Sequence, residues 1–319
     1  KGNTVAVISD GSAILGLGNL GPEAALPVME GKCILFKAFA GVDAFPICLA
    51  TQDTEEIIKT IKYIAPVFGG INLEDISAPR CFEIETRLEL ELDIPVMHDD
   101  QHGTATVVLA GLINALKVRA SSKEEVKLVI SGAGAAGVAI TKLLLKYGFR
   151  NIIVCDQTGA IYDGRDNLNE AKRELAALTN GTKIFGSLSG AIKGSDIFIG
   201  VSAPGILTAD MIKSMNKKPI ILALANPIPE IMPELAKSAG AFIVATGRSD
   251  YPNQLNNVLA FPGIFRGALD NKVKTISAVM LIRAAENLAN LVAEPAPDLI
   301  LPSPFDKAVV KAVSKAIYE

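Results

Sequence analysis

Short apolar runs that end in polar or glycine-containing loops recur along this chain, and several are separated by segments with a helical period. Residues 126–130 form one run, residues 138–147 follow with helical periodicity, and residues 151–155 form the next run. Apolar runs of this length that alternate with helices are typical of parallel strands buried on both faces. The pattern therefore predicts an α/β protein, and a chain of 319 residues predicts two domains.

Three glycines stand between the run at 126–130 and the helical segment that follows it. Gly132 permits a tight turn, Gly134 lets the backbone approach phosphate groups, and Gly137 allows close packing of the helix on the strand. Asp156 closes the next run, at the distance where a carboxylate accepts a hydrogen bond from the adenine ribose. The segment predicts a Rossmann-type doubly wound domain. Its predicted cofactor-binding residues are Gly132, Ala133, Gly134, Ala135, Ala136, Gly137 and Asp156.

The residue types around Asp156 bear on which cofactor this domain binds. A carboxylate at this position repels a 2′-phosphate, and Gln157 and Thr158 supply no positive charge. These residues favour NAD. NADP remains possible because a basic residue farther along the chain, for example Arg165, could reach the ribose.

A second glycine motif, Gly16 to Gly21, has the same spacing but a different context. Pro22 follows at once, Pro27 interrupts the next turn, and no second strand ends in an acid at the right distance. We interpret this segment as a turn and packing element.

Two acidic pairs, Glu74-Asp75 and Asp99-Asp100, each follow a short apolar run that reads as a strand. Carboxylates held a few ångströms apart raise one another's pKa unless a cation compensates their charge. A hard divalent cation with oxygen ligands is the natural partner for such a set. The alternative is that both pairs are helix N-caps or solvated loops.

Two histidines flank the second acidic pair. His98 and His102 have the spacing of a zinc-binding HExxH motif, which requires one helix through both histidines. Pro95 before them and Gly103 after them favour a strand-to-loop corner. We therefore expect both histidines to have a structural role or to support neighbouring site residues.

Composition narrows the partners and the compartment. A net charge of −3 gives no basic excess for nucleic acid or an anionic membrane. The four cysteines lack metal-binding spacing, which suggests reduced thiols. Neither a transmembrane run nor a signal peptide is visible, so we expect a cytoplasmic protein.

The predicted domain divisions are a catalytic and metal-binding domain at 1–103, the dinucleotide domain at 104–257, and C-terminal helices at 258–319 that return to the first domain.

The chain resembles the malic enzyme family, specifically its short prokaryotic branch, through long matching segments in order. The resemblance implies oxidative decarboxylation of L-malate to pyruvate and CO₂, with NAD or NADP and with Mg²⁺ or Mn²⁺. It also implies a homodimer or a higher homo-oligomer. The matching segments are SDGSAILGLGNLGPEAALPVMEGK, FKAFAGVDAFPICL, FGGINLEDISAPRCFEIE, IPVMHDDQHGTA, GAGAAG, ALANPIPEI and ATGRSDYPNQLNNVLAFPG.

The same resemblance implies a role for each candidate site residue. Lys32 is the implied general base that takes the proton of the malate hydroxyl, a choice over Lys37 that sequence physics alone does not make. Asp99 is its acidic neighbour. The implied metal ligands are Glu74, Asp75 and Asp100, and the implied substrate amides are Asn226 and Asn257.

One part of the family pattern is missing. The family's general acid is a tyrosine in a YTPG-type loop, and none of the five tyrosines here matches it. We expect that residue upstream of Lys1, in a longer protein. Three rival functions stay open: a malolactic enzyme that makes lactate with bound NAD, a metal-independent amino-acid or tetrahydrofolate dehydrogenase, and a non-catalytic nucleotide-binding module.

Overall fold

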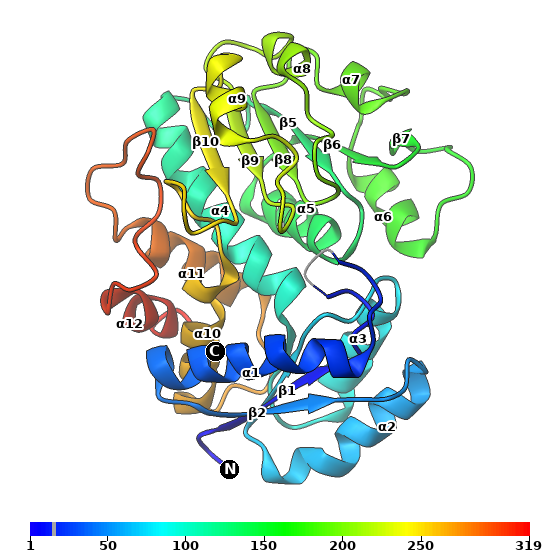
Figure 1. Cartoon of the computed structure of the whole chain (residues 1–319), viewed down its shortest axis with the longest axis vertical. Coiled ribbons are helices and arrows are strands. Elements are labelled where there is room, and N and C mark those ends of the chain that lie inside the picture. The colour runs from blue at the N-terminus through cyan, green and yellow to red at the C-terminus, as the bar shows by residue number, and fades with distance from the viewer. Residues whose placement is uncertain (15–16) are drawn as a thin grey trace. The chain divides into compact units, whose positions relative to one another are not determined.

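The computed structural model describes residues 1–14 and 17–319. The chain divides into two compact units, which share helix α4 (Asp99–Arg119; Figure 1). The first unit comprises residues 1–107, 257–291 and 303–319, and the second comprises residues 108–256 and 292–302.

A four-stranded parallel sheet with the order β2-β1-β3-β4 forms the centre of the first unit. Helices connect the successive strands, as parallel pairing requires. The strands are β1 (Thr4–Ser9), β2 (Asp43–Cys48), β3 (Gly70–Leu73) and β4 (Val96–His98). The connecting helices are α1 (Pro22–Ala40), α2 (Thr54–Ile64) with the short η1 (Ala65–Val67), and α3 (Arg80–Glu91).

Helix α1 corrects one expectation from the sequence, because it continues through Pro27, where we predicted an interruption. Burial of one face of the helix outweighs the backbone hydrogen bond that proline removes. The residues on that face are Ala25, Met29, Lys32, Phe36 and Ala40, so Lys32 lies inside the protein. Of the second glycine motif, Gly16 lies outside the described residues, and the remainder leads into α1.

The first of the longer C-terminal helices, at Phe261–Asp270, packs on α1 through an aromatic cluster. The ring of Phe36 on α1 meets Phe261 and Phe265 edge to face, with centroids 4.7 and 5.4 Å apart. The C-terminal helices of this unit are η2 (Asn257–Leu259), α10 (Phe261–Asp270), α11 (Ala278–Ala289) and α12 (Ala308–Ser314). Within the described residues, no helix combines the length and the apolar character needed to cross a membrane.

The second unit is built on a six-stranded sheet with the order β10-β9-β8-β5-β6-β7, parallel except for β7. The chain runs outward from β5 to β6 and then returns to the other side of β5 with β8, so a topological switch point lies between β5 and β8. The strands are β5 (Lys127–Ser131), β6 (Asn151–Asp156), β7 (Gly159–Ala160), β8 (Ile197–Gly200), β9 (Ile220–Ala223) and β10 (Ile243–Thr246).

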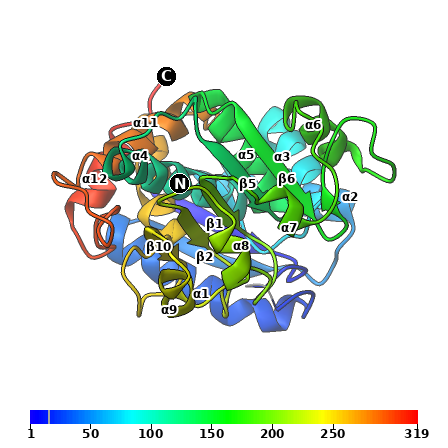
Figure 2. The same cartoon turned by 90° about the horizontal axis from the view of Figure 1, so that it is seen from above.

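Helices cover both faces of this sheet. Figures 1 and 2 show α5 and α6 on one face and α8 and α9 on the other, as right-handed connections require. The helices are α5 (Ala135–Tyr147), α6 (Glu170–Leu178), α7 (Leu188–Ala191), α8 (Ala209–Lys213) and α9 (Pro233–Ser238). The predicted α/β class with a Rossmann-type doubly wound domain is confirmed.

The four cysteines are free thiols, two of them buried and two half-buried. Burial raises the pKa of the Cys155 thiol to about 12, so this sulfur stays protonated and unreactive at neutral pH.

Candidate active site

The two acidic pairs lie side by side at one edge of the first sheet. β3 and β4 are paired in parallel with Leu73 opposite His98, so Glu74 and Asp99 leave neighbouring strands at the same level. The Asp75 N–H donates a hydrogen bond to Asp100 Oδ2 at 2.8 Å. Asp75 has a φ of 53°, a left-handed conformation that is costly for a residue with a side chain and is often found at functional sites. We call Glu74, Asp75, Asp99 and Asp100 the acidic cluster.

Lys32 points into the acidic cluster. Its Nζ contacts Glu74 Oε1 and Asp99 Oδ2, and it lies 4.5 Å from the centre of the Phe261 ring. Burial alone would lower the pKa of Lys32, but the carboxylates of Asp99 and Glu74 outweigh it and raise that pKa above its ordinary value. Lys37, the alternative in the sequence, is exposed and paired with Asp43 at 2.7 Å.

Negative charge is in excess in the acidic cluster: among the described residues, four carboxyl groups lie there and the ammonium of Lys32 pairs with two of them. Burial, followed by the charges of Asp100, Asp99 and Asp75, raises the pKa of the Glu74 carboxyl well above its ordinary value in spite of Lys32. Asp99 is fully buried, and its Oδ1 atom has no hydrogen-bond partner. The site therefore has unused acceptor capacity and uncompensated charge.

The donor chemistry of the acidic cluster fits a hard divalent cation, because carboxylates from two adjacent strand ends supply only oxygen ligands. Among the described residues, however, no three Asp, Glu, His or Cys side chains are already arranged around a common metal position. Glu74 is instead turned onto Lys32, and its Oε2 accepts a hydrogen bond from Asn72 Nδ2 at 3.0 Å. Metal binding would therefore require Glu74 to move from Lys32.

Glu85 on α3 holds the strand-to-helix corner that carries Asp99 and Asp100. Its buried carboxylate accepts hydrogen bonds from His98 N at 2.5 Å and Gln101 Nε2 at 2.8 Å, and its Oε2 lies 3.1 Å from His102 Nε2. The predicted strand-to-loop corner is wrong. The strand β4 ends at His98, and the helix α4 begins directly at Asp99 without a loop. His98 is therefore in a strand and His102 in a helix, which removes the basis for an HExxH zinc site.

Glu85 is not among the site residues predicted from the sequence, although the sequence carries a signal for it. Cys81, Ile84 and Leu88 form the buried face of α3, and Glu85 occupies that same face. An acid at an apolar position of an amphipathic helix must find buried partners.

One turn farther along α3, Glu89 makes the stability of the folded protein depend on pH. Burial, and then the charge of Glu85, raise the pKa of Glu89 to about 7 from its ordinary value of 4.5, against the opposing effect of His102. The folded state therefore keeps a proton that the unfolded chain loses, and stability falls as the pH rises from about 4.5 to about 7.

We expect Glu89→Gln to stabilise the protein at pH 8 by about 1–2 kcal/mol, a value reduced because water reaches part of this side chain. At pH 5 the variant and the parent should be nearly equal in urea denaturation. Glu83→Gln, at an exposed position of the same helix, is the control and should change stability by less than about 0.5 kcal/mol. An equal effect of Glu89→Gln at both pH values would contradict this assignment.

The two predicted substrate amides lie in different units. Asn257, at the start of η2, donates from Nδ2 to Asp99 Oδ2 at 2.5 Å and so belongs to the Lys32 site. Asn226 follows β9 in the second unit, where its Nδ2 lies 3.4 Å from Leu224 O.

The loop after Asn226 is held in place by Glu230, a fully buried acid that was not predicted from the sequence. Glu230 accepts hydrogen bonds from Ser202 N at 2.9 Å and Ala225 N at 3.0 Å.

The glycine loop of the second unit has the geometry of a phosphate cradle. A Cβ on Gly132, whose φ is 120°, would lie 2.5 Å from Val201 O, and a Cβ on Gly137 would collide with Gly132 O. A Cβ on Gly134 would instead meet nothing within 4 Å. Gly134 is also the N-cap of α5, whose N-terminal N–H groups favour an anion. Space beside Gly134 is what a bound pyrophosphate requires.

These contacts predict that valine at Gly134 impairs nucleotide binding, whereas valine at Gly137 impairs the stability of the fold. Gly134→Val should keep the thermal unfolding temperature of the parent but weaken NADH binding by at least about tenfold, because the side chain fills the cradle. Gly137→Val should lower the unfolding temperature, because its side chain forces α5 away from the loop. Calorimetric titration and thermal unfolding of both variants separate the two effects, and equal destabilisation by both would refute the cradle.

Asp156 is the last residue of β6, as predicted, but its carboxylate is already paired. Arg165 and Lys172 both contact it at 2.7 Å; Lys172 was not predicted from the sequence, because it lies on the next helix.

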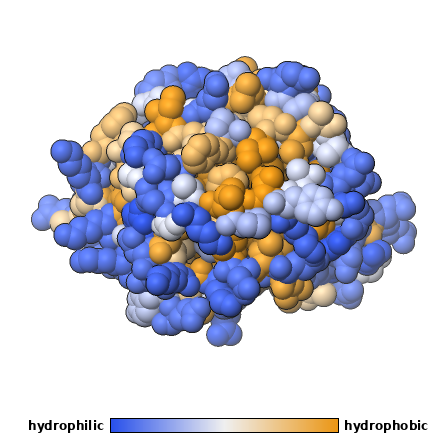
Figure 3. Space-filling view, turned by 90° about the horizontal axis from the view of Figure 1, so that it is seen from below, coloured by the Kyte–Doolittle hydropathy of each residue, from blue (hydrophilic) through white to orange (hydrophobic). Residues whose placement is uncertain are grey.

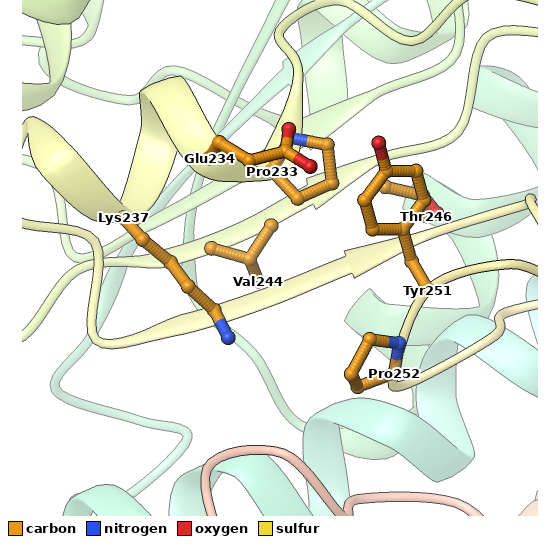
Figure 4. Close-up of a pocket in the computed structure, with 7 residues that line it drawn as sticks. All are labelled: Pro233, Glu234, Lys237, Val244, Thr246, Tyr251 and Pro252. Carbon is orange, nitrogen blue, oxygen red and sulfur yellow. The ribbon is translucent and has the colours of Figure 1, made fainter.

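A cavity of about 100 Å³ lies beside α9 and β10 and includes none of the predicted cofactor residues (Figure 4). It is smaller than the roughly 300 Å³ at which small-molecule pockets begin, so it does not hold a dinucleotide. Its lining residues are Pro233, Glu234, Lys237, Val244, Thr246, Tyr251 and Pro252.

The tyrosines of the first unit offer no proton donor at Lys32. Tyr63 and Tyr318 are exposed, and their rings lie under Lys59 and Arg283. The general acid is therefore not assigned to either of them.

Comparison with known proteins gives matches along nearly the whole chain. Residues 1–89 match the model described as "Malic enzyme, N-terminal domain", and residues 101–318 match "Malic enzyme, NAD binding domain". The chain is 60% identical to the "Bifunctional malic/malolactic enzyme" of Bacillus subtilis, over 99% of this chain and 78% of that protein. It is also 60% identical to the "NAD-dependent malic enzyme" of Geobacillus stearothermophilus, over 100% of this chain and 67% of that protein.

A solved structure gives the same result for the fold. The crystal structure of the NAD-dependent malic enzyme from Thermotoga maritima is 54% identical, with a TM-score of 0.96. The match covers 99% of this chain and 84% of that one.

Proposed function

Because this chain belongs to the malic enzyme family, we propose that it oxidises and decarboxylates L-malate to pyruvate and CO₂ with transfer of hydride to a nicotinamide cofactor. The observation that carries the proposal is the buried Lys32 in contact with Glu74 and Asp99, with Asn257 bonded to the same Asp99. This arrangement supports the proposal, because it brings a buried lysine, an amide and carboxylate oxygens together in the first unit.

In this reaction Lys32 takes the proton from the malate hydroxyl while hydride leaves the same carbon. A lysine can accept that proton only as the neutral amine. In the structure the surrounding carboxylates hold Lys32 as the ammonium. The base is therefore released when the negative charge of the acidic cluster is compensated, and Asp99 and Phe261 keep its Nζ in place.

Glu74, Asp75 and Asp100 are the residues that would hold Mg²⁺ or Mn²⁺. A divalent cation bound there would act as a Lewis acid on the keto oxygen, which favours loss of CO₂. Glu85 positions Asp100 through its hydrogen bonds to the corner at His98. In the second unit, the loop from Gly132 to Gly137 would bind the pyrophosphate of the cofactor, and Asn226 would contact the substrate.

A homo-oligomer and a cytoplasmic location remain part of the proposal. Figure 3 shows apolar side chains gathered on one face of the molecule within a polar rim, a feature that a partner subunit would cover. Exposed apolar residues of the first unit include Ile34 at 67%, Val67 at 65% and Phe45 at 49%. Light scattering of the purified protein measures the subunit number, and a monomer would contradict this part of the proposal.

A malolactic reaction is the second candidate, because a relative with 60% identity is named a bifunctional malic/malolactic enzyme. Product analysis separates the two reactions. We expect ¹³C-labelled malate, incubated with Mn²⁺ and NAD or NADP, to give labelled pyruvate in amounts equal to the reduced cofactor. Lactate without net cofactor reduction would replace the proposed function by the malolactic one.

A further inference from the structure

The guanidinium of Arg80 joins three loops at the carboxyl edge of the first sheet. Arg80 is the first residue of α3. Its Nη1 donates hydrogen bonds to Asp10 Oδ2 at 2.8 Å and to Gln52 O at 2.5 Å. Its Nη2 donates to Ser12 Oγ at 3.0 Å and to Ser77 Oγ at 3.2 Å. These partners lie in the loops that follow β1, β2 and β3, so one side chain ties three strand ends together.

The carboxylate of Asp10 holds Arg80 in this position. The side chain of Asp10 is completely buried, whereas that of Arg80 is 25% exposed. Asp10 Oδ1 accepts hydrogen bonds from Ser12 N at 2.9 Å and from Ser12 Oγ at 2.5 Å, which folds the loop after β1 into a compact turn. A buried carboxylate needs a cation as well as hydrogen bonds, and Arg80 supplies the cation. We call Asp10, Ser12, Gln52, Ser77 and Arg80 the Arg80 network.

The Arg80 network reaches Asp75 of the acidic cluster through two further hydrogen bonds. Ser77 N donates to Ser12 Oγ at 2.9 Å, and Ala13 N donates to Asp75 O at 3.0 Å. The loop after β1 is therefore bonded to the loop after β3 at Asp75 itself and two residues beyond it. A left-handed backbone at a residue with a side chain persists only where its surroundings hold it. These bonds supply that restraint for Asp75, whose φ is 53°.

The stability of α3 does not explain an arginine at this position. The N-terminus of a helix carries partial positive charge, so an acid or a capping side chain is favoured there and a cation is not. The contacts of Arg80 do explain it. The planar guanidinium donates to several fixed acceptors at once, whereas the ammonium of lysine is a single compact charge. Arg80 therefore serves the three loops and not the helix that it begins.

We propose that Arg80 is a positioning residue that fixes the carboxylate of Asp75 for a divalent cation. The inference rests on the proposed function in taking Asp75 as a metal ligand. Small divalent cations such as Mg²⁺ demand a nearly ideal arrangement of their oxygen ligands, so a displaced carboxylate binds them less well. Arg80 acts on Asp75 through Ser12 and the loop after β1, in the way that groups outside the ligand shell orient the ligands of a metal.

The test is calorimetric titration of the protein with Mn²⁺, without malate or nucleotide. We expect Arg80→Lys to weaken Mn²⁺ binding by about tenfold, because lysine can pair with Asp10 but cannot bond the three loops together. Since the charge pair is kept, the unfolding temperature without metal should fall by less than about 3 °C.

Arg87→Lys is the matched control, because it makes the same change on the same helix. Arg87 pairs at the surface with Glu55 of α2, with its Nη2 2.9 Å from Glu55 Oε2, outside the Arg80 network. This variant should leave the Mn²⁺ affinity within about twofold of the parent.

A double-mutant cycle with Asp75→Asn measures whether Arg80 acts through Asp75. Asparagine tolerates the left-handed conformation but removes the anionic oxygen, so Asp75→Asn alone should weaken Mn²⁺ binding by at least about tenfold. Adding Arg80→Lys to that variant should weaken binding by less than about twofold more, because the carboxylate that Arg80 positions is already lost. A general loosening of the fold would instead weaken binding by the same factor in both backgrounds.

Equal losses in the two backgrounds would overturn the inference. So would an Mn²⁺ affinity of Arg80→Lys within about twofold of the parent. These results leave the proposed function standing, provided that the parent binds Mn²⁺ and Asp75→Asn binds it more weakly. A parent that binds no Mn²⁺, or an Asp75→Asn variant that binds it as tightly as the parent, would overturn the ligand set of the proposed function as well.

Discussion

Replacing Lys32 by methionine should lower kcat for malate oxidation by about a thousandfold, since general base catalysis contributes about a hundredfold to ten-thousandfold. NADH binding should be unchanged, because the glycine loop belongs to the other unit. Methionine has a similar length and retains packing against Phe261, but it offers no amine. Initial rates and calorimetric titration of the same preparation give both quantities.

Lys37→Met is the control for this prediction. It lies one turn and a half farther along α1, is exposed, and pairs only with Asp43 at the surface, so it should leave kcat within about twofold. If Lys32→Met kept more than about a tenth of the parent kcat, Lys32 would not be the base. A normal far-ultraviolet circular dichroism spectrum of the variant is required before the rates are compared.

Replacing Asp100 by asparagine should weaken Mn²⁺ binding by at least about tenfold, because one anionic oxygen ligand is lost. Without metal, the same variant should be as stable as the parent or more stable. The asparagine oxygen can still accept the hydrogen bond from Asp75 N, and one of the charges that raise the pKa of Glu74 is removed. Weaker Mn²⁺ binding together with undiminished stability without metal distinguishes a metal ligand from a residue that only supports the fold.

Mn²⁺ at a hundred times its Kd stabilises a protein by about 2.7 kcal/mol, which thermal unfolding detects. We expect this stabilisation in the parent and its loss in Asp100→Asn. Asp93→Asn is the control, because Asp93 is an exposed acid of the same unit paired with Lys274 at 2.7 Å, and it should keep the full response. A full Mn²⁺ response in Asp100→Asn would remove Asp100 from the ligand set.

The parts of the fold that the sequence predicts well are those whose signals are local. The strand, glycine loop, helix and second strand from 126 to 156 each carry their own periodicity or turn chemistry, and β5, α5 and β6 follow that order. The acidic pairs were found in the same way, because each directly follows an apolar strand. Their adjacency required the parallel register of β3 and β4, which no local pattern contains.

The remaining features depend on contacts between distant segments. The burial of Lys32 follows from the packing of α1 on its sheet and on α10, which also carries the helix through Pro27. The charge at Asp156 depends on Lys172, which lies sixteen residues away on a helix. The sequence pointed to Arg165 as a basic residue near the ribose, but the pairing of Lys172 with Asp156 depends on where α6 packs, which no local pattern contains.

The most direct test of the account is the absorbance at 340 nm of the protein with L-malate, Mn²⁺ and either NAD or NADP, before and after EDTA. We expect formation of reduced cofactor with an equal amount of pyruvate, and loss of both when EDTA removes the metal. Cofactor reduction that continues undiminished in EDTA would contradict the role of the acidic cluster. The absence of any malate-dependent reduction or product would contradict the assigned reaction itself.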